Sequence, residues 1–138
     1  MIRRPIMATE PVKMRFTSGF DGEMTVEAGT FHIGEQGKGL QPYNLLLGAL
    51  GSCFYATFLD IVEKKRLKFD GATLDITGQK RTEVPSTLET VHIQMRIVNP
   101  SDEKQFLRSV ELGAKYCSIH ETVAKVATIT IDVEFVHS

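Results

Sequence analysis

The sequence has little cysteine, no tryptophan and no excess of charge of either sign. Its 138 residues contain 16 Lys and Arg against 17 Asp and Glu, which leaves a formal net charge of -1. A chain without a basic excess does not attract a phosphate backbone, so we expect no nucleic-acid partner. The two cysteines, Cys53 and Cys117, are too few for a disulfide scaffold and too far apart for a zinc motif. We therefore expect neither a bound metal nor a cofactor.

The amino terminus lacks the apolar run of a signal peptide, and the composition is that of a globular protein. Apolar residues make up 42% and charged residues 24%, which is enough material for the core of one domain. We expect residues 1–10 to form an N-terminal extension, mobile before Met7, and residues 11–138 to form a single domain. We expect a cytoplasmic protein whose thiols stay reduced.

The most apolar stretch, residues 43–59, carries no charge and is at the short end of the length that spans a membrane. Small and polar residues interrupt this stretch, and Asp60 follows it directly. These interruptions favour a core helix over a membrane span, so we expect no membrane partner.

Apolar periodicity predicts the order strands, helix, two strands, helix, strand. The expected strands are residues 12–16, 23–33, 72–78, 88–98 and 129–136, and the expected helices are residues 42–66 and 102–115, with a further helical turn up to 126. Within the strand at residues 88–98, apolar and polar side chains alternate, which is typical of an antiparallel strand with one solvated face. The whole pattern predicts an α+β fold with antiparallel sheets and central helices.

The helix expected at residues 42–66 begins at Pro42, which fits a first turn because its missing N–H needs no partner there. Apolar side chains surround this helix almost completely, which predicts burial on most sides. Gly48 and Gly51 each reduce helix stability by about 1 kcal/mol relative to alanine. We interpret them as sites of tight packing against another backbone.

Cys53 falls well inside this helix, whereas Cys117 falls at the end of the next one, beside Ser118 and His120. Both could be inert core thiols, since free cysteine is among the most often buried residue types. A functional pair requires Cα atoms less than about 7 Å apart and one thiol that ionises near a cation or a helix N-terminus. Cys53 is too deep in its own helix to benefit from that helix's dipole. A further alternative is a Cys/His site for a metal or for acid–base chemistry, in which His32 and His120 approach the thiols.

Two segments around the cysteines carry a resemblance to a known family. Residues 42–54, PYNLLLGALGSCF, place Pro42 upstream of Cys53 and join them by an apolar run rich in small residues. Residues 115–120, KYCSIH, place the second cysteine at a helix end. On these motifs, and on the order of elements over residues 11–136, the sequence resembles the OsmC/Ohr superfamily of thiol-dependent peroxidases. This superfamily comprises osmotically inducible and organic hydroperoxide resistance proteins.

The resemblance implies an OsmC-like fold, with curved antiparallel sheets around two long central helices in an intertwined homodimer and active sites at the subunit interface. It also implies an oxidoreductase of the oxidative stress response. Cys53 would be the peroxidatic thiolate that reduces an organic hydroperoxide and becomes a sulfenic acid. Cys117 would be the resolving thiol that closes a disulfide, which an external dithiol, often a lipoylated protein in the family, would reduce.

The sequence departs from the family at the groups that stabilise the thiolate. Phe20 stands where the family has an arginine in an early loop, and Tyr43 and Asn44 stand where it has a glutamate after the helix-opening proline. Without that ion pair we expect Cys53 to keep a pKa near its free value of about 8.5, or higher, and to react slowly. The cations that could substitute from another direction are Arg15, Lys38 and Arg96.

These departures leave a second function open, a non-enzymatic OsmC-like dimer that binds a small apolar ligand at the subunit interface. For either function we expect a substrate or ligand pocket with apolar walls. The candidate residues for that pocket are Phe20, Tyr43, Asn44 and Phe54.

Overall fold

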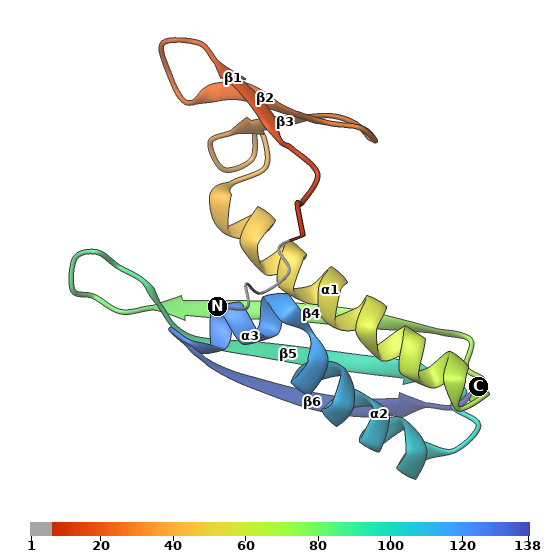
Figure 1. Cartoon of the computed structure of the whole chain (residues 1–138). Helices are drawn as coiled ribbons and strands as arrows, with labels where there is room; N and C mark the ends of the chain where they lie inside the picture. The colour runs from red at the N-terminus through yellow and green to blue at the C-terminus, as the bar shows by residue number, and fades with distance from the viewer. Residues whose placement is uncertain (1–6) are drawn as a thin grey trace, which may run out of the picture. The chain divides into compact units, whose positions relative to one another are not determined.

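The structure, a computed structural model, describes residues 7–138 and forms two compact units, the residues up to Leu45 and residues 46–138. Figure 1 shows the elements of both units. Of the expected N-terminal extension, residues 1–6 lie outside the described residues, and residues 7–10 have no regular secondary structure. The Glu10 carboxylate nevertheless accepts the backbone N–H of Glu27 at 2.7 Å, which ties this segment to the sheet that follows.

The first unit contains a three-stranded antiparallel sheet in the order β1-β2-β3. Its strands are β1 (Lys13–Phe16), β2 (Asp21–Val26) and β3 (Gly29–Gly34). The single strand expected at residues 23–33 is wrong, because the chain turns at residues 27 and 28 and pairs Val26 with Gly29. Gly29 has a φ of 153°, which residues with a side chain rarely adopt, so a glycine permits this hairpin.

This sheet has one polar and one apolar face because side chains alternate along each strand. On the polar face, Arg15 lies opposite Glu23 and forms an ion pair with it at 2.6 Å. On the apolar face, Met14 lies opposite Met24, which in turn lies opposite Phe31. Met14 and Phe31 are 50% and 42% exposed, so this face is an apolar surface that the described chain leaves partly uncovered.

The second unit contains a sheet in the order β4-β5-β6. Its strands are β4 (Gly71–Lys80), β5 (Leu88–Val98) and β6 (Thr128–Val136), and the helices of the chain are α1 (Pro42–Lys64), α2 (Glu103–Tyr116) and α3 (Ser118–Ala124). Because α2 and α3 return the chain from the end of β5 to its beginning, β6 pairs with β5 in parallel. The expectation of antiparallel sheets therefore holds for the β1–β2, β2–β3 and β4–β5 pairs and is wrong for β5–β6.

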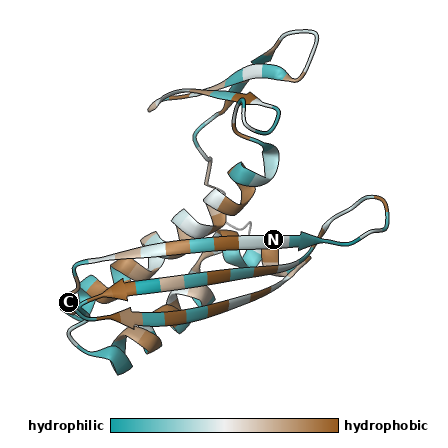
Figure 2. Cartoon of the chain, turned by 180° about the vertical axis from the view of Figure 1, so that it is seen from behind, coloured by the Kyte–Doolittle hydropathy of each residue, from teal (hydrophilic) through white to brown (hydrophobic). Residues whose placement is uncertain are grey.

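The helices of residues 46–138 lie on one face of this second sheet, as Figure 1 shows. The core between helices and sheet contains a group of aromatic rings in which Phe58 contacts both Phe54 and Phe106. Figure 2 shows the opposite face of the sheet, where hydrophilic and hydrophobic residues alternate along the strands. On this solvated face Arg96 of β5 pairs with Glu134 of β6.

Helix α1 presents one buried stripe to the core and leaves its other sides accessible. The buried positions are Leu50, Gly51, Phe54, Phe58 and Val62. In the most apolar 18-residue window of this helix 28% is buried, so residues 7–138 do not provide the burial expected on most sides. Among residues 7–138, α1 is the one helix with the length and hydropathy of a membrane span, and the core helix of a soluble protein passes the same test.

The two glycines of α1 differ in what surrounds them. A Cβ atom on Gly51 would overlap the side chain of Ile76, so α1 packs closely on β4 at this point. A Cβ atom on Gly48 would meet nothing within 4 Å. The expected close approach is therefore found at Gly51, although it is to a side chain and not to a backbone. At Gly48 the described residues show no close approach.

Candidate functional site

The two cysteines come together at the core of residues 46–138. Helix α1 carries Cys53, and Cys117 occupies the junction between α2 and α3. The two thiol side chains approach to 3.1 Å, and both cysteines are free. A contact between the side chains is the geometric requirement for a redox pair. The fold therefore brings the two thiols into contact.

Cys117 is positioned by the turn that ends α2 and starts α3. Its backbone is extended, with φ -77° and ψ 118°, so it is the C-cap of one helix and the N-cap of the next. Its sulfur accepts the backbone N–H of His120 at 3.3 Å, a contact that an oxygen usually makes at this position. The side chain is 1% exposed. Local capping thus holds the Cys117 sulfur in place next to Cys53.

Cys53 is the thiol that ionises more readily. Its partial burial works against the charged form, but hydrogen bonds from the backbone N–H of Ile119, the Cys117 thiol and both the hydroxyl and N–H of Ser118 outweigh that burial. Together they hold the pKa of Cys53 below its ordinary value. The Ser118 oxygen lies 3.9 Å from the Cys53 sulfur. The expectation of an unshifted or raised pKa is therefore wrong, because neutral donors take over the role of a cation.

The pKa of Cys117 shifts in the opposite direction. Burial raises the pKa of its thiol, and both the hydrogen bond to Cys53 and the charge on Cys53 raise it further. The backbone N–H groups of His120 and Ile119 oppose these effects without cancelling them. A thiol that ionises early, in contact with one that keeps its proton, is an arrangement that can form a disulfide once one sulfur has been oxidised.

The three cations considered as substitutes for the family's arginine have acidic partners of their own. Arg15 and Lys38 belong to the first unit, where each forms an ion pair with a glutamate. Arg96 pairs with Glu134 on the solvated face of sheet β4-β5-β6, whereas its neighbours Met95 and Ile97 are buried in the core on the other face. Arg96 therefore points away from the side of the sheet on which the cysteines lie.

Three of the residues expected to line a pocket belong to the first unit. Phe20 precedes β2, is 45% exposed and stacks on Phe16 with ring centroids 6.0 Å apart. Tyr43 and Asn44 lie in the first turn of α1. The Asn44 side chain accepts the N–H of Gln41 at 2.9 Å, which caps the start of the helix. Asn44 thus has a local structural role. Phe20 lines a cavity of about 300 Å³ together with Asp21, His32 and Lys38. A role in binding a substrate or ligand stays a prediction for all three residues.

Phe54, the fourth residue expected in the pocket, faces the core instead. It is fully buried, and its ring centroid lies 6.3 Å from that of Phe58. Adjacent helix positions point about 100° apart. Phe54 is therefore directed into the core, while Cys53 stays at the edge of the core with part of its surface accessible.

The two histidines considered as partners of the thiols are placed differently. His120 lies in α3, and its backbone N–H contacts the Cys117 sulfur. Burial lowers the pKa of the His120 imidazole, and the nearby Glu121 carboxylate opposes that effect only in part. His32 belongs to β3 in the first unit. Within residues 7–138 no group of three or more His, Cys, Asp and Glu residues is arranged to hold a metal ion.

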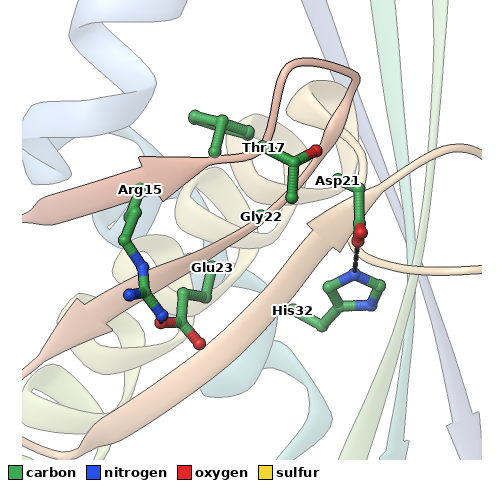
Figure 3. A pocket seen from close by; sticks show the side chains of 7 residues that line it. Arg15, Thr17, Asp21, Gly22, Glu23 and His32 are labelled. Atoms are coloured by element: carbon green, nitrogen blue, oxygen red, sulfur yellow. Dashed lines mark hydrogen bonds and ion pairs between the residues drawn. The ribbon is translucent and has the colours of Figure 1, made fainter.

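The polar face of sheet β1-β2-β3 holds a cavity of about 400 Å³, shown in Figure 3. Its lining residues are Arg15, Phe16, Thr17, Asp21, Gly22, Glu23 and His32. The Nε2 atom of His32 lies 2.6 Å from Asp21 Oδ1, and Nδ1 lies 2.7 Å from the Lys38 carbonyl oxygen. The hydrogen bond with Asp21, then that with Lys38, raises the pKa of His32. The charged groups of this cavity pair with one another, which is typical of a structural ion-pair cluster.

Ser118 and Ile119 are the site residues that reasoning from the sequence missed. That reasoning considered cations and the dipole of the helix that carries Cys53, whereas the donors come from the start of a different helix. The available signal was the break at residues 116–120, where a cysteine at a helix end is followed by a new helical turn. A helix start leaves its first N–H groups without intrahelical partners, and here they are directed at sulfur.

Comparison with known proteins agrees with this geometry. The family model described as OsmC-like protein matches residues 35–132, a range that contains both cysteines. A hydroperoxide reductase of Mycoplasma genitalium is 28% identical over 109 residues, which cover 75% of this chain and 77% of that protein.

Solved structures share the fold. An OsmC-like protein from Mycoplasma pneumoniae matches with a TM-score of 0.85 at 18% identity, covering 96% of this chain and 100% of that chain. The organic hydroperoxide resistance protein OhrB of Bacillus subtilis matches with a TM-score of 0.71 at 14% identity, covering 92% of this chain and 98% of that chain. Since the family model matches more than half of the sequence, including both members of the thiol pair, this chain belongs to the OsmC-like protein family.

Proposed function

We propose that this protein is a thiol-dependent peroxidase that reduces organic hydroperoxides, with Cys53 as the peroxidatic thiol and Cys117 as the resolving thiol. The observation that carries the proposal is the contact between the two thiols combined with the opposite displacement of their pKa values. The relative named hydroperoxide reductase supports the substrate class. We place this chemistry in the cytoplasm, where thiols are kept reduced.

The proposed reaction balances in three steps. The Cys53 thiolate attacks the terminal oxygen of ROOH and breaks the O–O bond, and the alkoxide takes up a proton and leaves as ROH, so that Cys53 becomes a sulfenic acid. The Cys117 sulfur then attacks the Cys53 sulfur, forms a disulfide and releases the hydroxyl with a proton as water. An external dithiol, such as a lipoylated protein, reduces the disulfide by exchange and is itself oxidised.

The protonation states of the two thiols suit these steps. The first step needs a thiolate, and the hydrogen bonds to Cys53 favour that form. The second step needs a proton for the departing hydroxyl, and Cys117, whose pKa is raised by burial, holds one. The side chains are already in contact at 3.1 Å, so closing a disulfide of about 2.05 Å requires only a small movement.

We further propose that the protein acts as a homodimer in which the second copy completes an apolar crevice for the hydroperoxide. Two apolar surfaces support this assembly. One is the face of sheet β1-β2-β3 that contains Met14 and Phe31, and the other is the accessible side of α1, where Leu46 is 38% exposed. A chain with a formal net charge of -1 has no basic excess for an anionic lipid surface, which favours a second copy over a membrane as the partner.

The test is a peroxidase assay with matched variants. Purified protein is mixed with tert-butyl hydroperoxide and dihydrolipoamide, and hydroperoxide consumption is followed for the wild type, Cys53→Ser, Cys117→Ser and Ser52→Ala. We expect turnover in the wild type and in Ser52→Ala, and only background consumption in Cys53→Ser. Ser52 is a suitable control because it neighbours Cys53 in α1, but its hydroxyl donates to the Ala49 carbonyl at 3.2 Å. Equal background-level consumption in all four proteins would rule out the peroxidase.

The alternative, a non-enzymatic dimer that binds a small apolar ligand, is favoured by the half-exposed ring of Phe20 at the position of the family's arginine. Calorimetric titration with a medium-chain fatty acid distinguishes the two functions. Binding that is unaffected by Cys53→Ser, in a protein without peroxidase activity, would support the alternative.

A further inference from the structure

The Ser118 hydroxyl lies beside Cys53 without a capping role that would explain its presence. In the first turn of α3 the cap position belongs to Cys117, whose sulfur accepts the N–H of His120. Ser118 follows the cap, so its hydroxyl is not needed to satisfy the helix start. Its oxygen instead lies 3.9 Å from the Cys53 sulfur on α1. The hydroxyl therefore joins two helices at the reacting atom.

We propose that Ser118 is a further catalytic residue, whose hydroxyl donates a hydrogen bond to the Cys53 thiolate in place of a cation. This inference rests on the proposed peroxidase function. A hydroxyl rotates freely and donates to a negatively charged sulfur more strongly than to a neutral thiol, so the contact shortens as Cys53 ionises. Ser118 is exposed and Cys53 is partly accessible, so the donor and the sulfur are both open to solvent in the described chain.

Among the hydrogen-bond donors to Cys53, the Ser118 hydroxyl is the one whose contribution a substitution can test separately. Ile119 donates through its backbone N–H, which a side-chain substitution leaves in place. Cys117 donates through its thiol, which also takes part in the proposed reaction. Its removal would therefore change both the hydrogen bond to Cys53 and the formation of the disulfide. The Ser118 hydroxyl can be removed alone, and it acts in the same direction as the other donors.

Ser52 provides a matched comparison. It is adjacent to Cys53 in the sequence, and its hydroxyl donates to the Ala49 carbonyl at 3.2 Å. Both serines are exposed, so the loss of either hydroxyl should leave folding intact. A difference between Ser118→Ala and Ser52→Ala therefore reports the contact with Cys53.

The test measures the ionisation of Cys53 separately from turnover. All variants are made in a Cys117→Ser background, which keeps a capping side chain at the start of α3 and leaves one thiol. Each is alkylated with iodoacetamide between pH 5 and 10, and the adduct is quantified by mass spectrometry. Ser118→Ala should slow alkylation at pH 7 by about three- to tenfold, Ser118→Thr should restore it, and Ser52→Ala should leave it unchanged.

A Ser118→Ala profile that coincides with the Ser52→Ala profile would overturn the role of Ser118. The peroxidase proposal would survive that result if the two-cysteine protein consumes hydroperoxide and Cys53→Ser does not. If Ser118→Thr fails to restore the rate that Ser118→Ala loses, the change is one of structure and not of the hydroxyl, which also overturns the inference. Slower alkylation in Ser118→Ala with rescue by threonine supports it, whichever hydroperoxide proves to be the substrate.

Discussion

The hydrogen bond between the thiols of Cys53 and Cys117 acts on the two groups in opposite directions: it adds to the burial that raises the pKa of Cys117, and it joins the Ile119 N–H in lowering the pKa of Cys53 against the effect of burial. Cys53 is partly accessible, whereas Cys117 is buried. The sulfur that ionises is thus at the edge of the core, and the sulfur that keeps its proton is inside. Among residues 7–138, neutral donors lower the pKa of Cys53 without a charged side chain, so Phe20 in place of an arginine does not by itself prevent this thiol from ionising.

Removing Cys117, the proposed resolving thiol, should allow a sulfenic acid on Cys53 to accumulate. In Cys117→Ser treated with one equivalent of alkyl hydroperoxide, we expect dimedone to label Cys53, because no neighbouring thiol condenses with the sulfenic acid. The wild type should show little adduct and should form the Cys53–Cys117 disulfide instead. Mass spectrometry of tryptic peptides measures both products. Adduct formation on Cys117 of the wild type would contradict the assigned roles.

The two thiols should titrate in a defined order. Alkylation follows the thiolate, so its rate rises with pH through the pKa of each cysteine. Since the pKa of Cys53 is lowered and that of Cys117 is raised, Cys53 should react at lower pH than the same residue in urea-unfolded protein, and Cys117 at higher pH. Site-resolved mass spectrometry after brief iodoacetamide exposure measures the order, and a reversed order would refute it.

The contribution of His32 to stability should depend on pH. Its pKa is raised in the folded state by the hydrogen bond with Asp21 and then by that with the Lys38 carbonyl. The contribution is therefore fully present below the unfolded value of about 6.5 and is lost as the pH rises through the higher folded value. In urea unfolding, the difference between wild type and His32→Gln should be larger at pH 5.5 than at pH 8.5. An imidazole that titrates at or below 6.5 by NMR would contradict this expectation.

Close packing of α2 on α1 should make Gly113 intolerant of a side chain. A Cβ atom there would lie 3.1 Å from Phe58 Cβ and 3.2 Å from its Cα, and a backbone atom cannot move aside as a flexible side chain can. We expect Gly113→Ala to lower the free energy of unfolding by about 1–3 kcal/mol. Gly19→Ala is the control, since its Cβ would approach only Thr17 Oγ1, at 3.9 Å, and should change the free energy by less than about 0.5 kcal/mol. Urea titration compares the two variants, and equal effects would contradict the packing.

The apolar face of sheet β1-β2-β3 should be part of the proposed dimer. Met14 lies on that face, and its neighbour Lys13 lies on the polar face. By sedimentation equilibrium the wild type should have about twice the chain mass of 15.4 kDa. Met14→Glu should shift the protein to monomer, whereas Lys13→Glu, which changes the charge more, should leave the dimer intact. A monomeric wild type, or equal effects of the two substitutions, would overturn the proposed assembly.

Local patterns in the sequence determined most of the elements. Pro42 starts α1 as expected, and the strand predicted at residues 88–98 matches β5 (Leu88–Val98). The helix predicted from residue 102 begins where the Asp102 carboxylate accepts the Gln105 N–H at 3.1 Å. Such features depend on alternation and capping within a few residues, so a single sequence contains the information that specifies them.

Tertiary structure decided two other features, the hairpin turn at residues 27 and 28 and the parallel pairing of β5 with β6. The first depends on which segments find partners across the sheet, and the second on the path of α2 and α3 over the core. Alternation along a strand shows which residues face the core, but it does not show the direction of the neighbouring strand.

In the candidate site too, the sequence identified some features and the tertiary structure decided others. The sequence alone identified Cys53 and Cys117 as the candidate reactive residues. They are the two cysteines of the chain, and each lies in one of the segments that resemble the OsmC/Ohr superfamily. Only the folded chain brought the two thiols into contact and directed Ser118 and Ile119 at Cys53. The reason is physical: the pKa of a thiol depends on donors within a few ångströms, and here those donors come from a helix far away in the sequence.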